Sequence, residues 1–361
     1  MISKTPNFDK ALDEILENLK PHTRICKQCS SNFEIFKEDV DFYHKLRVPP
    51  PTLCPHCRKQ RRLAFYGPST FYKRKCDAPD HGEEIISLFP GGISFKVYDT
   101  KYWWSDKWGA EEYSSNYNGK FLEQIKELFN RVPLQQTNRD SKSVDSPYTA
   151  GGMELKSCYY IFGGLKSENI MYGNWPIWAR DCIDILMAYK SELCYEIVSA
   201  INNYNCNFIY FSDNCLDSNF LYDCKNCTHC FGCTNLRNKQ YYFFNKPLTR
   251  EAYEEKLRSI DLGSRKEFKH WYGEFLRFIG GEIKRATRNE KTINSVGNFL
   301  RECRGCFMNF WVEGGENLRY ADYGLNARDS MDVSVFYSIE RCYESSTPTG
   351  GYEIKFSTWL R

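Results

Sequence analysis

The chain has 361 residues, 42% of them hydrophobic and 26% charged, and its formal net charge is only +3. This composition is typical of a globular protein of two or three domains and excludes a wholly disordered chain. No apolar run reaches the roughly 18 residues of a membrane helix, and the N-terminus lacks the zones of a secretory signal. We therefore expect a cytoplasmic protein with no membrane partner, whose 17 cysteines are thiols or metal ligands rather than disulfides.

Residues 1–21 predict a short amphipathic helix. Apolar side chains recur at helical spacing from Phe8 to Leu19, and Pro21 then ends the pattern. We expect the apolar side of this helix to pack on the following domain. A helix that binds a partner is the alternative.

Residues 22–76 predict a zinc-ribbon module. Two Cys-x-x-Cys pairs, separated by 24 residues, supply Cys26, Cys29, Cys54 and Cys57. Each pair can place two thiolates about 2.3 Å from one ion, and two pairs complete a tetrahedron. Four thiolates select zinc or iron over hard cations. The pattern predicts a structural Zn²⁺ site, because a closed four-cysteine site leaves no coordination position open for catalysis.

A basic margin surrounds the end of this module. Residues 1–76 hold 15 Lys and Arg against 8 Asp and Glu, a local balance of +7. The residues of the basic margin are Arg58, Lys59, Arg61, Arg62, Lys73, Arg74 and Lys75. Four aromatic residues lie among them, Phe65, Tyr66, Phe71 and Tyr72. This mixture suits RNA or DNA, with cations on phosphates and rings under bases. The alternatives are a solvated helix face with core aromatics, or a dock for the acidic remainder of the same chain.

Five motifs between residues 46 and 240 carry a family resemblance that spans nearly the whole chain. They are LRVPPPTLCPHCRKQRRLAF at 46–65, YKRKC at 72–76, KVY at 96–98, WWSDKW at 103–108 and CFGCTNLRNKQ at 230–240. They resemble an uncharacterised family of Cys-rich zinc-ribbon proteins from environmental bacteria with small genomes. The resemblance implies no activity; some members carry an automatic CaiB/BaiF CoA-transferase label that no residue pattern here supports. Some members look to have a second four-cysteine site. Cys76 is kept here, but Pro79, Asp99 and Tyr102 replace the other three, which implies that the second site is absent.

Residues 77–150 predict a mixed α/β connecting region. A strand is expected at 95–98 and a helix at 121–129, before Pro133. We expect Trp103, Trp104 and Trp108 to pack in a core, because large aromatics dominate cores. Stacking on a base or sugar is the alternative.

A twelve-residue period marks residues 151–248, the first repeat block. Its leading positions are Cys158, Ile170, Cys182, Cys194 and Cys206. Each unit begins with a short run rich in Ile, Val, Phe and Tyr and closes with turn residues. The pattern predicts a β-solenoid in which two units make a coil of about 24 residues and the leading side chains form buried ladders.

The second repeat block, residues 293–361, copies the first at an offset of 148. Residues 158–196 match 306–344 at 14 of 39 positions, including Cys194 and Cys342. Duplication is therefore predicted, with Arg180 beside Asp181, and their copies Arg328 beside Asp329, as exposed rim pairs. The second copy stops before the equivalent of the first copy's end, which predicts a fragment of a longer protein. The helical insertion at 249–292 is expected to cover an edge or end of the repeats.

Cys224, Cys227, Cys230 and Cys233 follow one another at three-residue spacing. This spacing resembles iron–sulfur ligation and makes them a possible second metal site. We favour buried structural thiols instead, because the same cysteines also continue a nine-residue rhythm from Cys206.

The predicted fold class is mainly β with some α: a four-cysteine zinc ribbon, then a duplicated β-solenoid-like region interrupted by helices. No Gly-rich phosphate loop, His-Glu-x-x-His motif or nucleophile elbow is present. We therefore expect a zinc-binding, non-enzymatic binding or scaffold protein whose partner is RNA, DNA or another protein. One alternative is a carbohydrate-active solenoid that uses Asp181, Asp184, Asp329 and Asp332, because paired carboxylates can cleave glycosidic bonds. The other is a scaffold for protein–protein contacts alone.

Overall fold

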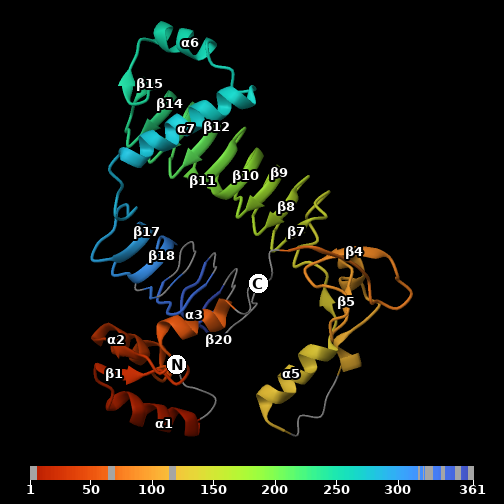
Figure 1. Cartoon of the computed structure of the whole chain (residues 1–361). Coiled ribbons are helices and arrows are strands. Elements are labelled where there is room, and N and C mark those ends of the chain that lie inside the picture. The colour runs from red at the N-terminus through yellow and green to blue at the C-terminus, as the bar shows by residue number, and fades with distance from the viewer. Residues whose placement is uncertain are drawn as a thin grey trace. The chain divides into compact units, whose positions relative to one another are not determined.

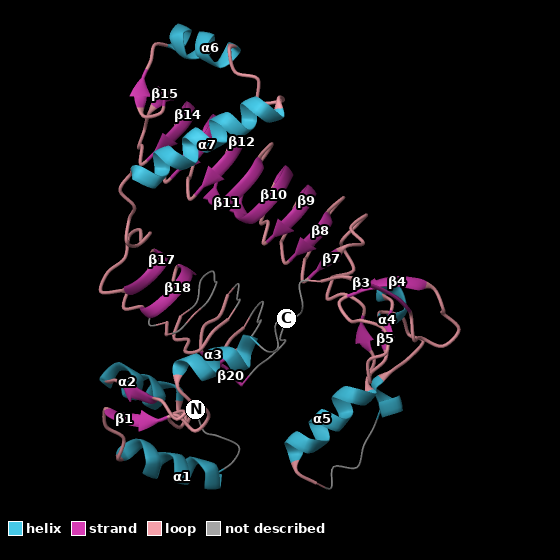
Figure 2. Cartoon of the chain, in the orientation of Figure 1, coloured by secondary structure: helices cyan, strands magenta, loops and turns pink. Residues whose placement is uncertain are grey.

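Figure 1 shows the computed structural model of the chain. It describes residues 6–63, 70–113, 119–315, 318, 319, 321, 328–334, 338–345 and 351–356. Residues 1–67 and 284–361 form a first compact unit, and residues 68–283 form a second. Among the described residues, strands account for 35% and helices for 23%, so this part of the chain is mainly β with some α, as predicted (Figure 2).

The first unit joins the N-terminal module to the second repeat block. Its elements are α1 (Pro6–Glu17), β1 (His22–Ile25), β2 (Asn32–Ile35), α2 (Lys37–Leu46), α3 (Pro55–Leu63), β17 (Val296–Arg301), β18 (Phe307–Glu313), β19 (Cys342–Glu344) and β20 (Ile354–Phe356). Leu12 and Leu16, one helical turn apart, are buried with Tyr43 of α2. The apolar side of α1 therefore packs on the following module, which confirms that expectation. Met331 and Tyr343 of the second repeat block belong to the same apolar cluster.

The second unit begins with small sheets and continues into a large one. Its early elements are β3 (Tyr72–Lys75), β4 (Glu84–Ser87), β5 (Val97–Tyr98), α4 (Thr100–Trp103), η1 (Ala110–Tyr113), α5 (Phe121–Arg131) and β6 (Leu134–Gln135). The helix expected at 121–129 is thus present, and the strand expected at 95–98 is shorter, with only residues 97 and 98 in β5. Trp103 and Trp108 pack on a core that includes Val97 and Tyr98, whereas Trp104 is exposed. Residues 72–76, predicted as the end of the zinc module, lie in this second unit.

Ten strands form the large sheet of the second unit. They are β7 (Thr149–Ala150), β8 (Tyr159–Phe162), β9 (Glu168–Asn174), β10 (Arg180–Tyr189), β11 (Tyr195–Ile201), β12 (Tyr204–Tyr210), β13 (Leu216–Tyr222), β14 (Thr228–Thr234), β15 (Gln240–Phe243) and β16 (Lys246–Pro247). From β7 to β15 the strands lie in sequence order and pair in parallel. Ile185 pairs with Ile197, and Ile197 pairs with Ile209. Neighbouring strands are therefore twelve residues apart, and the predicted pairing of two units into a coil of about 24 residues is wrong.

The backbone of these repeats turns at every third residue. From Glu154 to Phe244, each third residue has a positive φ, for example 51° at Asp181 and 56° at Asp184. This left-handed conformation is costly for most L-residues, and Asn, Asp and Gly tolerate it best. The residue after each corner points inward, as Cys182 and Ile185 do. The buried side chains consequently recur every three residues rather than every two, as they would in an ordinary strand.

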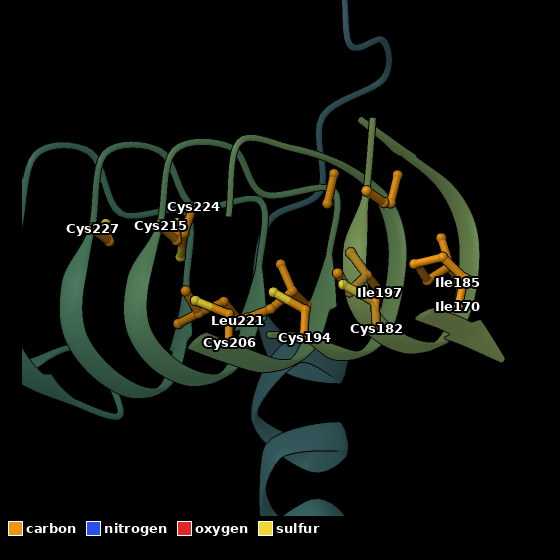
Figure 3. Close-up of a cluster of buried hydrophobic side chains, with 14 of the residues drawn as sticks. Ile170, Cys182, Ile185, Cys194, Ile197, Cys206, Cys215, Leu221, Cys224 and Cys227 are labelled. Carbon is orange, nitrogen blue, oxygen red and sulfur yellow. The ribbon is translucent and has the colours of Figure 1, made fainter. Parts of the chain in front are cut away.

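The inward side chains stack into an apolar core (Figure 3). Cys182, Cys194 and Cys206 follow one another along one row, and Ile185 and Ile197 along another. These side chains are almost fully buried, as the predicted ladders require.

Ile197→Ala is expected to destabilise the second unit by about 2–5 kcal/mol, because it leaves a cavity in a stacked row. Leu216→Ala, on an exposed side chain of β13, should cost much less. Urea unfolding followed by hydrogen exchange in β10 to β13 measures both. Equal losses for the two variants would show that the inward row is not the core.

Two helices cover part of the outer face of the sheet. They are α6 (Arg250–Arg258) and α7 (Arg265–Gly281). The Thr249 hydroxyl caps α6 by accepting a hydrogen bond from the Ala252 backbone N–H, 3.2 Å away. Phe275 of α7 is buried among ring side chains that include Phe208 and Phe220. The insertion thus covers a face of β12 to β15 rather than only an edge.

The second repeat block keeps the three-residue rhythm of burial. Leu300, Cys303 and Cys306 are buried at successive third positions. Strands β17 and β18 pair in parallel, with one irregularity where the spacing changes from eleven to twelve residues. Buried residues of the first block also have buried counterparts 148 positions later, for example Cys194 and Cys342.

Candidate metal centre

The two cysteine pairs are positioned by a tight turn and by a helix start. Strand β1 ends directly before Cys26, and the backbone then folds back so that the Ser30 N–H donates to the Cys26 carbonyl at 3.0 Å. Ser30 takes the left-handed conformation that closes this turn, which brings Cys29 beside Cys26. Helix α3 begins at Pro55, a residue suited to the first helical position, so Cys57 lies one turn after Cys54.

The four sulfur atoms form one compact cluster. All four lie within 4.8 Å of one another, and the Cys29 and Cys54 sulfurs are 3.8 Å apart. In a tetrahedral site with metal–sulfur bonds of about 2.3 Å, the sulfurs are about 3.8 Å apart. Cys26, Cys54 and Cys57 are buried and Cys29 is exposed. Among the described residues, no other group of three or more potential ligands is this compact. The predicted four cysteines therefore come together in a site that can hold a metal ion.

Backbone groups favour the ionised form of the first thiol. The Cys54 N–H donates to the Cys26 sulfur at 3.2 Å, and the Cys57 N–H donates to the Cys54 sulfur at 3.5 Å. Burial raises the pKa of Cys26, but backbone N–H groups outweigh it and lower this pKa to about 6. Burial and then the neighbouring thiols raise the pKa of Cys57 to about 12. Four crowded sulfurs cannot all ionise easily without a cation between them, which is what a metal ion supplies.

Cys76 lies in a similar backbone setting with different partners. Strand β3 ends directly before Cys76, and the Asp99 N–H donates to its sulfur at 3.2 Å. The Tyr102 N–H in turn donates to the Asp99 carboxylate at 2.6 Å. Asp99 and Tyr102 thus occupy the places that Cys54 and Cys57 have in the cluster. This setting therefore contains one thiol, where the cluster of Cys26 contains four.

Cys224, Cys227, Cys230 and Cys233, the possible second metal site, all point into the core of the repeats. Each is buried, and burial raises the pKa of the Cys224 thiol well above its ordinary value. They occupy successive inward positions of the repeat coils. Among the described residues they are not one of the compact groups of potential metal ligands. This placement favours the interpretation as structural thiols.

Three arginines of the basic margin lie on α3 and contact the second repeat block. Arg58 and Arg62 form ion pairs with Asp332, and Arg61 pairs with Glu344. Only 2% of the Arg58 side chain and none of the Asp332 side chain is exposed. The Arg62 Nε also donates to the Ser334 hydroxyl at 3.3 Å. Arg58 and Arg62, predicted to contact nucleic acid, are therefore buried against carboxylates, and the alternative of an internal dock applies to them.

Two further ion pairs join the N-terminal module to the same block. Lys45 of α2 pairs with Asp329, and Arg319 pairs with the buried Asp39 at 2.6 Å. Asp329 and Asp332 are thus held by cations, so they do not form the free carboxylate pair of a glycoside hydrolase. The predicted rim pair of Arg328 and Asp329 does not form; Arg328 pairs with Glu340 at 3.4 Å instead. Asp181 likewise accepts a hydrogen bond from Asn169 rather than pairing with Arg180.

The rest of the basic margin lies elsewhere. Lys73 pairs with Glu84, and Arg74 pairs with Asp77, both within the second unit. Lys75 is exposed and Lys59 is half-buried. Phe71 stacks on Phe162 with ring centroids 4.7 Å apart, so it packs within the second unit. Phe65 and Tyr66 lie outside the described residues.

Comparison with known proteins adds no family to this description. No family model matches the chain, and no curated protein or solved structure matches it. Within the described part of the chain, no helix is both long and apolar enough to cross a membrane.

Proposed function

We propose that the chain is a non-enzymatic scaffold protein in which a zinc-held module is fixed to a duplicated β-solenoid. One Zn²⁺ bound by Cys26, Cys29, Cys54 and Cys57 would fill the compact cluster. Because four thiolates close the coordination sphere, the ion stabilises the fold and does not act on a substrate.

The regular pairing of strands twelve residues apart supports the solenoid. The matched burial of Cys158 and Cys306, and of Cys194 and Cys342, supports the duplication. Stacked repeats of this kind present long surfaces, and such surfaces commonly bind other proteins.

The observation that carries the proposal is the burial of Arg58 and Arg62 against Asp332. A helix that served nucleic acid would keep its guanidinium groups in solvent, where phosphates can reach them. Here they hold the module on the second repeat block, so the module has a structural task. A protein is consequently the partner we favour, and the carbohydrate-active and nucleic-acid functions have weaker support.

Metal analysis combined with a nucleic-acid titration tests this function. We expect one zinc ion per chain and no RNA or DNA binding that weakens steeply with salt, since each lost phosphate contact changes the slope by about 0.7 to 0.9. Protein purified without zinc, or loaded with iron, would contradict the metal assignment. A steep salt dependence that Lys59→Ala flattens would contradict the scaffold role.

A further inference from the structure

The second repeat block holds the N-terminal module through a defined acidic docking surface. This surface consists of Asp329, Met331, Asp332, Tyr343 and Glu344. Its three carboxylates pair with Lys45, Arg58, Arg62 and Arg61. Met331 and Tyr343 are buried in the apolar cluster that also contains α1 and α2 side chains, and the Tyr343 hydroxyl donates to the Pro49 carbonyl at 3.2 Å.

The first repeat block carries the same five positions 148 residues earlier. We name this set the first-block acidic face: Asp181, Ile183, Asp184, Tyr195 and Glu196. The three acidic residues and the tyrosine are identical in the two sets, and isoleucine takes the place of methionine. These residues lie on the adjacent parallel strands β10 and β11 of the large sheet, where Ile183 pairs with Tyr195.

In contrast to its counterpart, the first-block acidic face is open. Ile183 is 42% exposed and Tyr195 is 40% exposed, whereas Met331 and Tyr343 are buried. Asp184 is exposed, and Glu196 accepts a hydrogen bond from the Tyr210 hydroxyl. Within the part of the chain that the structure describes, no basic side chain forms an ion pair with this face.

The sheet on either side of this face is covered by other parts of the chain. On one side Phe71 stacks on Phe162, next to Tyr160. On the other side α7 lies over Phe208 and Phe220. Strands β9 to β11 lie between these two covers, and they also expose Tyr172 and Leu186. The neighbouring parts of this sheet surface are covered by Phe71 on one side and by α7 on the other. The first-block acidic face is the uncovered part between them.

Two acidic surfaces of this composition are present, and the second repeat block holds α3 through buried ion pairs. Among the residues that the structure describes, no basic helix pairs with the first-block acidic face.

We propose that the first-block acidic face binds an arginine-bearing helix of a partner protein. This inference rests on the proposed scaffold function and on the duplication. The partner helix carries arginines at the three- and four-residue spacing of Arg58, Arg61 and Arg62, which places them on one side of a helix. Arginine suits this role because its guanidinium pairs with carboxylates in a fixed, often bidentate geometry.

The test measures binding of a defined peptide to the full chain. The probe is a fluorescent peptide of residues 55–63 with Cys57→Ser, stapled into a helix because nine residues do not hold a helix in water. We expect saturable binding that weakens with salt. Asp184→Lys should weaken it by at least about ten-fold, since it reverses a central charge of the face. Glu255→Lys, the same charge change on an exposed position of α6, should leave it unchanged.

Charge reversal in the peptide provides the matched control. A peptide with Arg58→Glu should bind the unmodified chain weakly and recover affinity for the Asp184→Lys chain. Absence of binding, or equal binding by the Asp184→Lys and Glu255→Lys chains, would overturn the inference. A dimer of the chain alone that Asp184→Lys dissociates would assign the face to a second copy and also overturn it. Zinc content, measured on the same samples, separates these outcomes from a failure of the proposed function.

Discussion

Asp332→Ala is expected to lower the free energy of unfolding of the first unit by about 3–5 kcal/mol, since it leaves buried cations without their carboxylate. Arg58 and Arg62 both pair with Asp332, and all three side chains are buried. Hydrogen exchange in α3 and β19 under increasing urea measures the loss directly. The exchange of the second unit should not change, because Asp332 belongs to the first unit.

The sequence match between the two repeat blocks provides a matched control for this variant. Asp184→Ala removes the same residue type at the equivalent position of the first repeat block, where the side chain is exposed. It should change stability by no more than about 0.5 kcal/mol. Similar losses for Asp184→Ala and Asp332→Ala would show that the carboxylate matters for the repeat itself and not for docking of α3. A double variant, Asp332→Leu with Arg58→Met, should recover part of the loss, because Arg62 is then the one buried cation of the two that is left without its carboxylate.

The candidate metal site was predictable from the sequence because its chemistry is local. The two residues between the cysteines of each pair fix a tight turn that brings the two sulfurs together. A single contact between the two pairs then completes the site. Burial of the repeat side chains was also predictable, since the leading cysteines and isoleucines recur at a fixed spacing. In both cases the signal lies in the spacing of a few residues along the chain.

The environment of the basic margin was not predictable in the same way. Arg58 finds its partner 274 residues later in the chain, and a run of arginines has the same appearance whether it meets phosphates or carboxylates. The useful sequence signal was the acidic set around Asp332, which matches the set around Asp184. Only the structure shows that α3 covers the first of these sets and not the second.

The sequence predicted a coil of about 24 residues, whereas neighbouring strands are twelve residues apart. The backbone conformation explains this error. Corners such as Asp181 and Asp184 place L-residues in the left-handed region at every third position. Ordinary strands alternate every two residues, so a short apolar run was interpreted as half of a longer coil. The frequent Asn and Asp at corners were the sequence signal for tight turning.

Cys54→Ser is expected to unfold the N-terminal module and abolish zinc binding. Zinc-binding free energies of about 10–16 kcal/mol act as folding free energy in such modules, and most domains have a total stability of only about 5–15 kcal/mol. The Cys54 sulfur would be one of the four ligands and lies 3.8 Å from the Cys29 sulfur of the other pair, so its replacement affects both cysteine pairs. Metal analysis and hydrogen exchange of residues 22–63 measure the effect.

The loss should extend into the second repeat block and stop there. Met331 and Tyr343 share an apolar cluster with the module, so removal of the module exposes them and speeds exchange in β19. The large sheet of the second unit has its own core and should keep its protection. Cys76→Ser is the control: it removes a buried thiol that shares its backbone setting with the ligands but is not part of the cluster, and zinc content should not change. A Cys54→Ser chain that retained one zinc ion, or whose β19 stayed as protected as before, would contradict the view that the metal holds this module on the repeat block.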